Sequence, residues 1–212
     1  MRVLLVGFGP FPGAPFNPSA LLVKALGRRR RPTLAGLTLT THVFATAYAA
    51  VDRDLATLFA AKPAIVLIFG LAACRRHVCI ETRARNAVSV LFPDAGGYRP
   101  PASVITAGKP SWRRGNAPFV RLLHAARRSG LPVRLSRDAG RYLCNYAYWQ
   151  ALQRAEQNGA LVAFVHIPPI RFAAARNGKK AGTTLQQLSR AAEAILIALA
   201  GAHRSVTARR SS

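Results

Sequence analysis

The sequence predicts an α/β protein in a single domain, with a mostly parallel, twisted central sheet and helices on both of its faces. Two observations lead to this prediction. Short runs rich in Val, Leu and Ile at 2–6, 64–69 and 161–165 have the composition of strands that are buried on both faces. Helical patterns lie between strand patterns, and this alternation requires right-handed crossovers and a parallel sheet. The 212 residues suffice for one domain, which we place at 1–203, followed by a basic, frayed tail at 204–212.

The elements can be placed in order along the chain. The first strand ends at Gly7, a stiff Gly/Pro loop follows, and Asn17-Pro18-Ser19 marks the start of a helix that runs to about residue 26. The following strands are expected at 37–44, 64–69, 133–135 and 161–165, and the following helices at 51–61, 116–129, 145–158 and 183–199. Residues 93–110 are rich in Pro and Gly and indicate an irregular loop or a short hairpin.

The charge balance limits the classes of function. The chain has 31 basic and 7 acidic residues, a net charge of +24, which favours contact with anionic partners. However, only residues 28–31 form a basic block, and no aromatic residues are interleaved with the basic pairs elsewhere. We therefore expect nonspecific binding to polyanions at low salt and no specific nucleic-acid function. The first loop also lacks a dinucleotide pattern, because position 12 is Pro where G-x-G-x-x-G needs glycine.

The cysteines indicate free thiols. Three cysteines at positions 74, 79 and 144 cannot all pair with one another, and their spacing matches neither a zinc site nor a C-x-x-C motif. No apolar run approaches the roughly 20 residues of a membrane helix, and the first apolar run is too short for a signal peptide. We therefore expect a cytoplasmic protein with no metal, no cofactor and no contact with a membrane.

Residues 136–145 are the stretch most indicative of chemistry. They place Cys144 just after a Gly-containing turn, in the first turn of a predicted helix. Unpaired N–H groups and the positive end of the helix dipole favour a thiolate there, so the pKa of Cys144 is expected below about 8.5, and the same N–H groups can hold an oxyanion. The alternative is that Cys144 is a small buried hydrophobic residue.

Two further residues complete a candidate catalytic set. Of the five histidines, only His166 follows directly on a buried strand, where ligands bind in parallel sheets. Glu81 lies in the segment after the strand at 64–69. Cysteine catalysis needs a base such as His166 and a carboxylate such as Glu81 to orient it. In the alternative readings His166 is structural and Glu81 pairs with Arg83 or Arg85.

Four stretches of the chain resemble the pyroglutamyl-peptidase I family, cysteine peptidases that remove N-terminal pyroglutamate. Residues 7–13 with Asn17-Pro18-Ser19 resemble its first loop, and residues 135–145 are similar to its nucleophile motif nearly residue for residue. Residues 164–168 resemble the segment with its histidine. Residues 70–86 are similar to its glutamate motif, with Glu81, Ala84 and Asn86 in register.

The resemblance implies a metal-free cysteine omega peptidase that hydrolyses the bond after an N-terminal pyroglutamyl residue through a thioester. It implies that Cys144 is the nucleophile, that His166 is the base and that Glu81 orients it. It also implies a homo-oligomer. The same resemblance assigns substrate binding to a set of mostly apolar residues around the flat lactam: Phe8, Phe11, Asn17, Leu71, Tyr142 and Leu143. For Phe8 and Phe11, packing in the core is the alternative.

The chain also departs from the family pattern. It has Ala73-Cys74-Arg75-Arg76 where the family usually has two small residues and one Arg, and Thr82-Arg83 where a basic and an aliphatic residue are usual. Residues 87–91 lack the usual Asp and Arg residues. Two alternatives follow from these differences: a non-catalytic homologue that binds polyanions through its basic surface, and an acyl hydrolase with an altered substrate.

Overall fold

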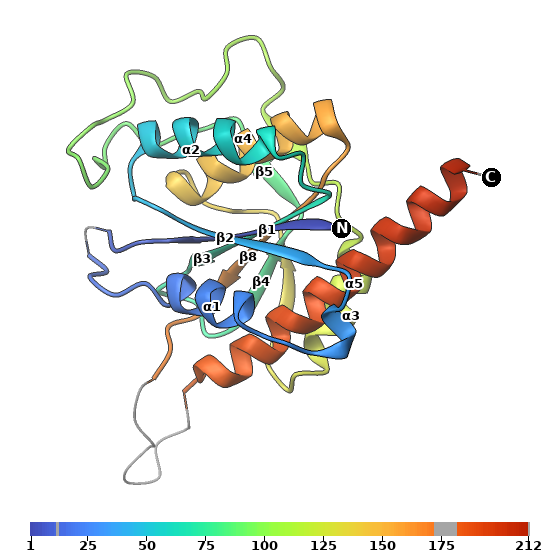
Figure 1. Ribbon diagram of the computed structural model, residues 1–212. Coiled ribbons are helices and arrows are strands. Elements are labelled where there is room, and N and C mark those ends of the chain that lie inside the picture. Colours follow the sequence, from blue (N-terminus) through green and yellow to red (C-terminus); the bar gives the residue numbers. More distant parts are fainter. Residues whose placement is uncertain (12, 172–181, 212) are drawn as a thin grey trace, which may run out of the picture.

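A computed structural model describes residues 1–11, 13–171 and 182–211, with the side chains of 210 and 211 left out. The chain forms one α/β domain around a six-stranded sheet (Figure 1), as the sequence predicts. The strand order is β2-β1-β3-β8-β4-β7. The strands are β1 (Arg2–Phe8), β2 (Thr38–Phe44), β3 (Ile65–Leu71), β4 (Val78–Glu81), β7 (Val133–Ser136) and β8 (Leu161–Ile167).

The sheet is mostly parallel and reverses its direction once. Strands β2, β1, β3 and β8 are parallel to one another, whereas β4 pairs with β8 in the antiparallel sense, and β7 runs parallel to β4. A separate antiparallel pair is formed by β5 (Arg83–Arg85) and β6 (Trp112–Arg114). Two strands are therefore reversed at one edge of the sheet, and the catalytic glutamate predicted from the sequence, Glu81, lies on one of them.

Helices cover both faces of the sheet (Figure 1). On one face lie α1 (Pro18–Gly27), α3 (Phe119–Arg127) and α5 (Leu185–Ser211), whose apolar side chains share one core with alternate sheet residues. On the other face lie α2 (Tyr48–Ala60) and α4 (Leu143–Asn158), which share a second core with the remaining sheet residues. Because successive strand residues point to opposite faces, each position in the sheet can be assigned to one of these layers.

The predicted elements agree with the structure except in a few places. No strand was predicted in the segment 76–86. In the structure this segment contains β4 and β5. The helix predicted at 183–199 is longer than expected, because α5 continues to Ser211 through most of the segment predicted as a tail. The helix predicted at 116–129 is shorter, since its first residues form the turn before Phe119. A 3-10 turn at Pro32–Leu34 connects α1 to β2.

Candidate active site

A turn that depends on Gly140 places Cys144 at the start of α4. The amide of Asp138 donates to Ser136 Oγ (3.1 Å), and the Asp138 carboxylate accepts from the Gly140 amide (3.0 Å). Gly140 has a φ of +85°, a conformation that favours glycine. The chain then enters α4 through Tyr142, whose extended backbone occupies the N-cap position without a side-chain hydrogen bond to the helix. The amides of the first turn, including that of Cys144, therefore lack intrahelical acceptors and can donate hydrogen bonds to an anion.

Asn145 fixes the first turn of α4 against β5. Its side chain is fully buried, and its Oδ1 accepts from the Arg85 amide (2.8 Å). Its Nδ2 donates to the carbonyls of Arg85 and Ala87, both at 2.9 Å. Sequence reasoning did not identify this role. The available signal was an Asn inside a helical turn, where its side chain usually serves local backbone groups.

His166 and Glu81 meet on the face of the sheet that α4 covers. Glu81 and Cys79 pair in register with Phe164 and His166 across the antiparallel β4–β8 ladder, so all four side chains share this face. The imidazole Nδ1 lies 2.8 Å from Glu81 Oε1, in a pair that is almost fully buried. The hydrogen bond places the carboxylate and the ring in the relation that the sequence predicted.

Arg75 also contacts Glu81, and the sequence did not predict this contact. Its Nη1 donates to the same Glu81 oxygen at 2.9 Å, and its Nη2 donates to the carbonyl of Asp138 at 3.0 Å. The expected alternative partners of Glu81, Arg83 and Arg85, make no ion pair with it among the described residues. Arg75 therefore links the carboxylate to the turn that precedes the nucleophile.

The ionisation of Glu81 follows from these contacts. Burial alone would raise the pKa of its carboxyl group. The hydrogen bond from His166, its charge and the guanidinium of Arg75 outweigh burial and hold the pKa of Glu81 below its ordinary value. A carboxylate accepts hydrogen bonds only, so His166 donates from Nδ1, and Nε2 is the ring nitrogen that does not face Glu81.

The sulfur of Cys144 lies over the strand position next to His166. Gly70 and His166 are register partners in the parallel β3–β8 ladder, so their Cβ positions lie on the same face. A Cβ built on Gly70 would lie 2.8 Å from Cys144 Sγ. The sulfur and the imidazole are thus neighbours above the sheet, but no hydrogen bond joins them among the residues described. In free enzymes such contacts are often long and shorten when the substrate binds.

The predicted lowering of the Cys144 pKa is wrong for the free protein. Burial around the sulfur, with a smaller contribution from the negative charge of Glu81, raises the pKa of the thiol to about 12. These two effects outweigh the helix start that suggested a thiolate. The cysteine is therefore a protonated thiol at neutral pH, and it needs a base to become a nucleophile.

The predicted substrate-binding residues fall into two groups. Phe8, Asn17 and Leu143 are buried. The Phe8 ring packs against Phe44 and Phe164, with centroids 5.6 and 6.4 Å apart, and Phe164 in turn contacts the His166 ring at 4.9 Å. Phe8 therefore supports the site from within the core, as the alternative reading of this residue held.

The other three predicted contacts are accessible. Phe11, Leu71 and Tyr142 are half-buried, and Tyr142 donates a hydrogen bond from its hydroxyl to the carbonyl of Pro93 (2.9 Å). Asn17, by contrast, is used structurally. Its Oδ1 accepts from the Ser19 amide at the N-cap of α1 (3.1 Å), and its Nδ2 donates to the carbonyl of Gly9 (3.1 Å). Asn17 thus shapes the loop that presents Phe11.

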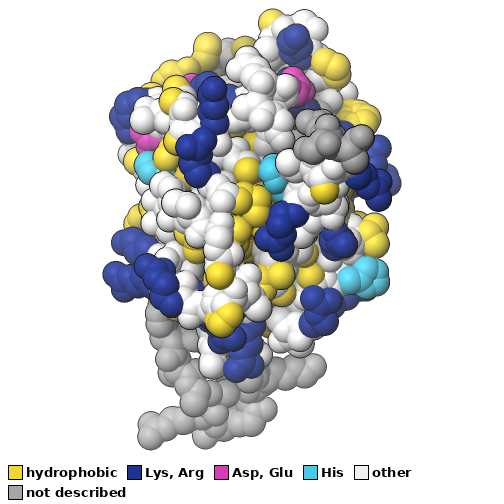
Figure 2. All heavy atoms as spheres, turned by 45° about the vertical axis from the view of Figure 1, so that its right-hand side comes forward, with side chains coloured by type: hydrophobic (Ala, Val, Ile, Leu, Met, Phe, Trp, Pro, Cys, Tyr) yellow, Lys and Arg dark blue, Asp and Glu magenta, His cyan; other side chains and the backbone are white. Residues whose placement is uncertain are grey.

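The basic surface is discontinuous on the face shown in Figure 2, where Lys and Arg side chains form several separate groups. Among the described residues, no group of three or more His, Cys, Asp or Glu side chains is arranged to hold a metal ion. The three cysteines are free thiols, as expected. Within the same part of the chain, the helices are too short or too polar to cross a membrane.

Comparisons with known proteins agree with this geometry. The family model described as "Pyroglutamyl peptidase" matches residues 1–205. A pyrrolidone-carboxylate peptidase of Cupriavidus pinatubonensis is 32% identical over 192 residues, which cover 89% of this chain and 88% of that protein. A namesake from Gloeobacter violaceus is 31% identical over 198 residues, which cover 92% and 95%. The solved pyrrolidone carboxyl peptidase of Thermococcus litoralis superposes with a TM-score of 0.84 at 25% identity, covering 94% of this chain and 93% of that one.

Proposed function

The chain belongs to the pyroglutamyl peptidase family, and we propose that Cys144, His166 and Glu81 carry out its reaction. The protein is a cysteine omega peptidase, a hydrolase whose substrates are peptides with an N-terminal pyroglutamyl residue. Family membership favours this activity over a non-catalytic, polyanion-binding homologue. The observation that supports the residue roles is the hydrogen bond from His166 to Glu81 beside the strand position that Cys144 Sγ covers.

Acylation begins with the transfer of the thiol proton. Since the pKa of Cys144 is raised, the free enzyme holds a neutral thiol. When the substrate carbonyl lies against the sulfur, His166 Nε2 takes the proton as Sγ bonds to the carbonyl carbon. Glu81 accepts the Nδ1–H bond and stabilises the imidazolium. The free amides at the start of α4, including that of Cys144, stabilise the oxyanion.

The imidazolium then completes the first half of the reaction. Its Nε2–H protonates the departing amine, the C–N bond breaks, and a thioester on Cys144 remains. In the second half, His166 takes a proton from water, the hydroxide attacks the thioester carbonyl, and the proton returns to the sulfur as pyroglutamate leaves. The histidine thus ends each turnover in its starting state.

The apolar surroundings suit a neutral lactam. Phe11, Leu71 and Tyr142 are partly exposed, and they offer flat or aliphatic surface to the ring. A free N-terminal glutamate would carry both an ammonium group and a carboxylate into this site, and burying unpaired charges costs several kcal/mol. We infer that these three side chains select pyroglutamate over glutamate.

The three free thiols lead us to place the enzyme in a reducing compartment, the cytoplasm.

The test is hydrolysis of a pyroglutamyl chromogenic amide. We expect turnover by the wild-type protein, loss of turnover in Cys144→Ala, and protection of the Cys144 thiol from iodoacetamide by substrate. Cys74→Ser is the matched control, because Cys74 is an exposed thiol in the β3–β4 turn and should keep full activity. His166→Ala should lower kcat more than Glu81→Gln, about 10³-fold or more. Unchanged activity in Cys144→Ala would refute the assignment.

A further inference from the structure

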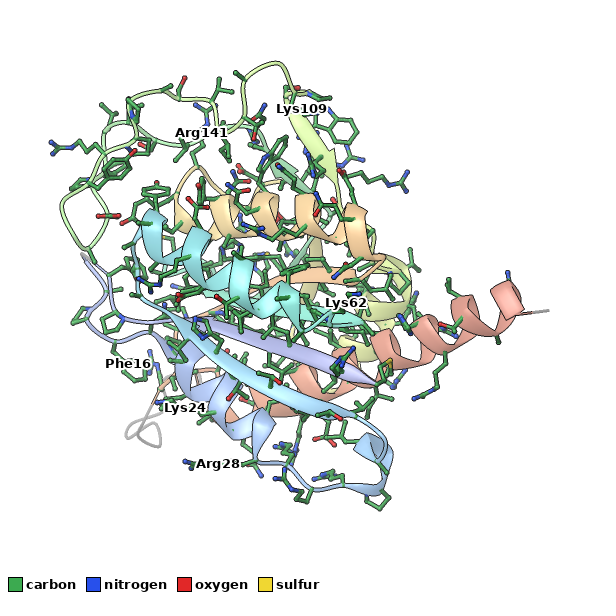
Figure 3. All side chains as sticks on the ribbon, turned by 45° about the horizontal axis from the view of Figure 1, so that its top comes forward. Phe16, Lys24, Arg28, Lys62, Lys109 and Arg141 are labelled. Carbon is green, nitrogen blue, oxygen red and sulfur yellow. The ribbon has the colours of Figure 1, made fainter. Side chains whose placement is uncertain are left out.

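A cavity of about 550 Å³ lies beside the N-terminal ends of α2 and α4, and its lining residue Tyr146 is two positions after Cys144 in the first turns of α4. Figure 3, in which this layer comes forward, shows the long segment after β5 arching over the ends of both helices. The hydrogen bond between the Ser89 amide and the carbonyl of Arg141 (2.6 Å) joins that segment to the turn before α4. The walls include three tyrosines and two carboxylates, from Tyr48, Tyr98, Tyr146, Asp52 and Asp94.

These two carboxylates differ from every other acidic side chain of the protein. The chain has only seven acidic residues against 31 basic ones. Five of the seven form ion pairs, namely Asp54, Glu81, Asp138, Glu156 and Glu193. Within the described residues, Asp52 and Asp94 have no cationic partner, and both line the same cavity. In a protein with such an excess of arginine, the unpaired carboxylates are thus gathered in one place.

Neutral donors hold both carboxylates in position. Asp52 accepts from the hydroxyl of Tyr146 at 2.9 and 2.8 Å and from Gln150 Nε2 at 3.3 Å. Asp94 is buried and accepts from the amides of Tyr48 and Tyr98, both at 3.0 Å, and of Gly96 at 2.9 Å. These donors are all neutral, so neither carboxylate has a cationic partner at the wall of the cavity. A bound cation would gain from both charges.

The three tyrosines of the cavity also favour the binding of a cation. Tyr48 makes edge-on contacts with Tyr98 and Tyr146, with ring centroids 6.0 and 5.0 Å apart. Its hydroxyl is buried and has no hydrogen-bond partner in the described structure. Burial, followed by neighbouring tyrosines and Asp94, raises the pKa of Tyr48, so its hydroxyl stays neutral. Neutral aromatic rings beside carboxylates attract ammonium and guanidinium groups.

We propose that this cavity binds the ammonium or guanidinium side chain of a lysine or arginine in the part of the peptide that follows pyroglutamate. This inference rests on the proposed function. Pyroglutamate is N-terminal, so all remaining residues of the substrate extend from the carbonyl that Cys144 attacks. Tyr142 connects the two places: it precedes Leu143 and Cys144 in sequence, and its ring contacts Tyr48 at 6.1 Å. Its hydroxyl donates to the carbonyl of Pro93, next to Asp94.

The experiment compares peptides that differ only in charge. Pyroglutamyl peptides with a single lysine at the first, second or third following position are each paired with the same peptide carrying acetyl-lysine. We expect kcat/KM to be about five- to tenfold higher for free lysine at one or more of these positions. The preference should fall to about twofold or less in Asp52→Asn, which keeps the shape and the hydrogen bonds from Tyr146 and Gln150.

The control variant is Asp54→Asn. Asp54 lies on the same helix but is paired with His42 and Arg53 and does not line the cavity, so its substitution should leave the lysine preference intact. Equal kcat/KM for lysine and acetyl-lysine at all three positions in the wild type would overturn the proposal, as would an undiminished preference in Asp52→Asn. The uncharged chromogenic amide separates the two hypotheses: if it is not hydrolysed, the proposed function itself fails.

Discussion

Gly70→Ala tests whether the position of the Cys144 sulfur requires that residue 70 has no side chain. A Cβ at residue 70 would lie 2.8 Å from Cys144 Sγ and 2.9 Å from Cζ of Phe164. Carbon atoms in contact prefer separations of about 3.5–4.0 Å, so both contacts are too short by roughly 1 Å and each must be relieved. Phe164 is fully buried between Phe8, Tyr148 and His166, so the overlap with its ring must be absorbed by the packed core and the strand. The sulfur, on a partly exposed residue, must move.

Two measurements follow from this displacement. Overpacking of a dense core costs about 1–3 kcal/mol, so the free energy of unfolding in urea should fall by that amount. A 1 Å misplacement of a reacting group can cost about 10²-fold, so kcat/KM for a pyroglutamyl amide should fall roughly 100-fold. The control is Gly201→Ala in α5, where a Cβ meets nothing within 4 Å. It should raise helix stability by up to about 1 kcal/mol and leave kcat/KM unchanged.

The outcome that would refute this reasoning is a folded Gly70→Ala protein with wild-type kcat/KM. It would mean that the reaction tolerates a displaced sulfur. The position of Cys144 Sγ above Gly70 would then not be needed for nucleophilic attack.

The remaining predictions concern the charges and hydrogen bonds around the site. In Arg75→Gln, Glu81 loses a cation, so its pKa should rise and the acid limb of the pH profile of kcat/KM should move to higher pH; Arg76→Gln, an exposed neighbour, should not move it. Because folding lowers the pKa of Glu81 below 4.5, its ionisation stabilises the fold above that pH; urea titrations should show the advantage over Glu81→Gln shrinking as pH falls below 4.5. Asn145→Ala removes three buried hydrogen bonds and should lower the free energy of unfolding by about 3 kcal/mol, measured by chemical denaturation. With a raised thiol pKa, alkylation of Cys144, followed by mass spectrometry, should rise about tenfold per pH unit from 7 to 9; a plateau near neutrality would contradict a buried thiol.

Local patterns were enough to predict most of the sheet. The runs at 2–6, 64–69 and 161–165 are buried on both faces, so their continuous apolar composition was enough to predict strands. The four-residue β4 was missed because it is short and is flanked by arginines, and its burial comes entirely from tertiary packing. The length of α5 was underestimated for a related reason: its last turns extend beyond the apolar pattern used to find its end.

The site was predictable in part. A histidine after a buried strand and a cysteine in the first turn of a helix are visible in sequence, because each depends on one element. The contact of Arg75 with Glu81 was not, since it depends on how a turn folds back over a reversed strand. The thiol pKa was mispredicted because the helix start is a local feature, whereas the burial of the sulfur depends on how α4 packs onto the sheet near Gly70.

The reversal of β4 has a consequence for how this enzyme can vary. Since β4 runs against β8, Glu81 reaches His166 from inside the sheet layer and not from a loop at its rim, and it has no exposed surface. The place of the carboxylate beside His166 is thereby set by strand pairing, and Arg75 of the β3–β4 connection adds one contact from outside the sheet. A segment such as 87–91 can exchange residues while strand pairing keeps Glu81 beside His166, whereas a change at residue 75 removes a charge contact to Glu81.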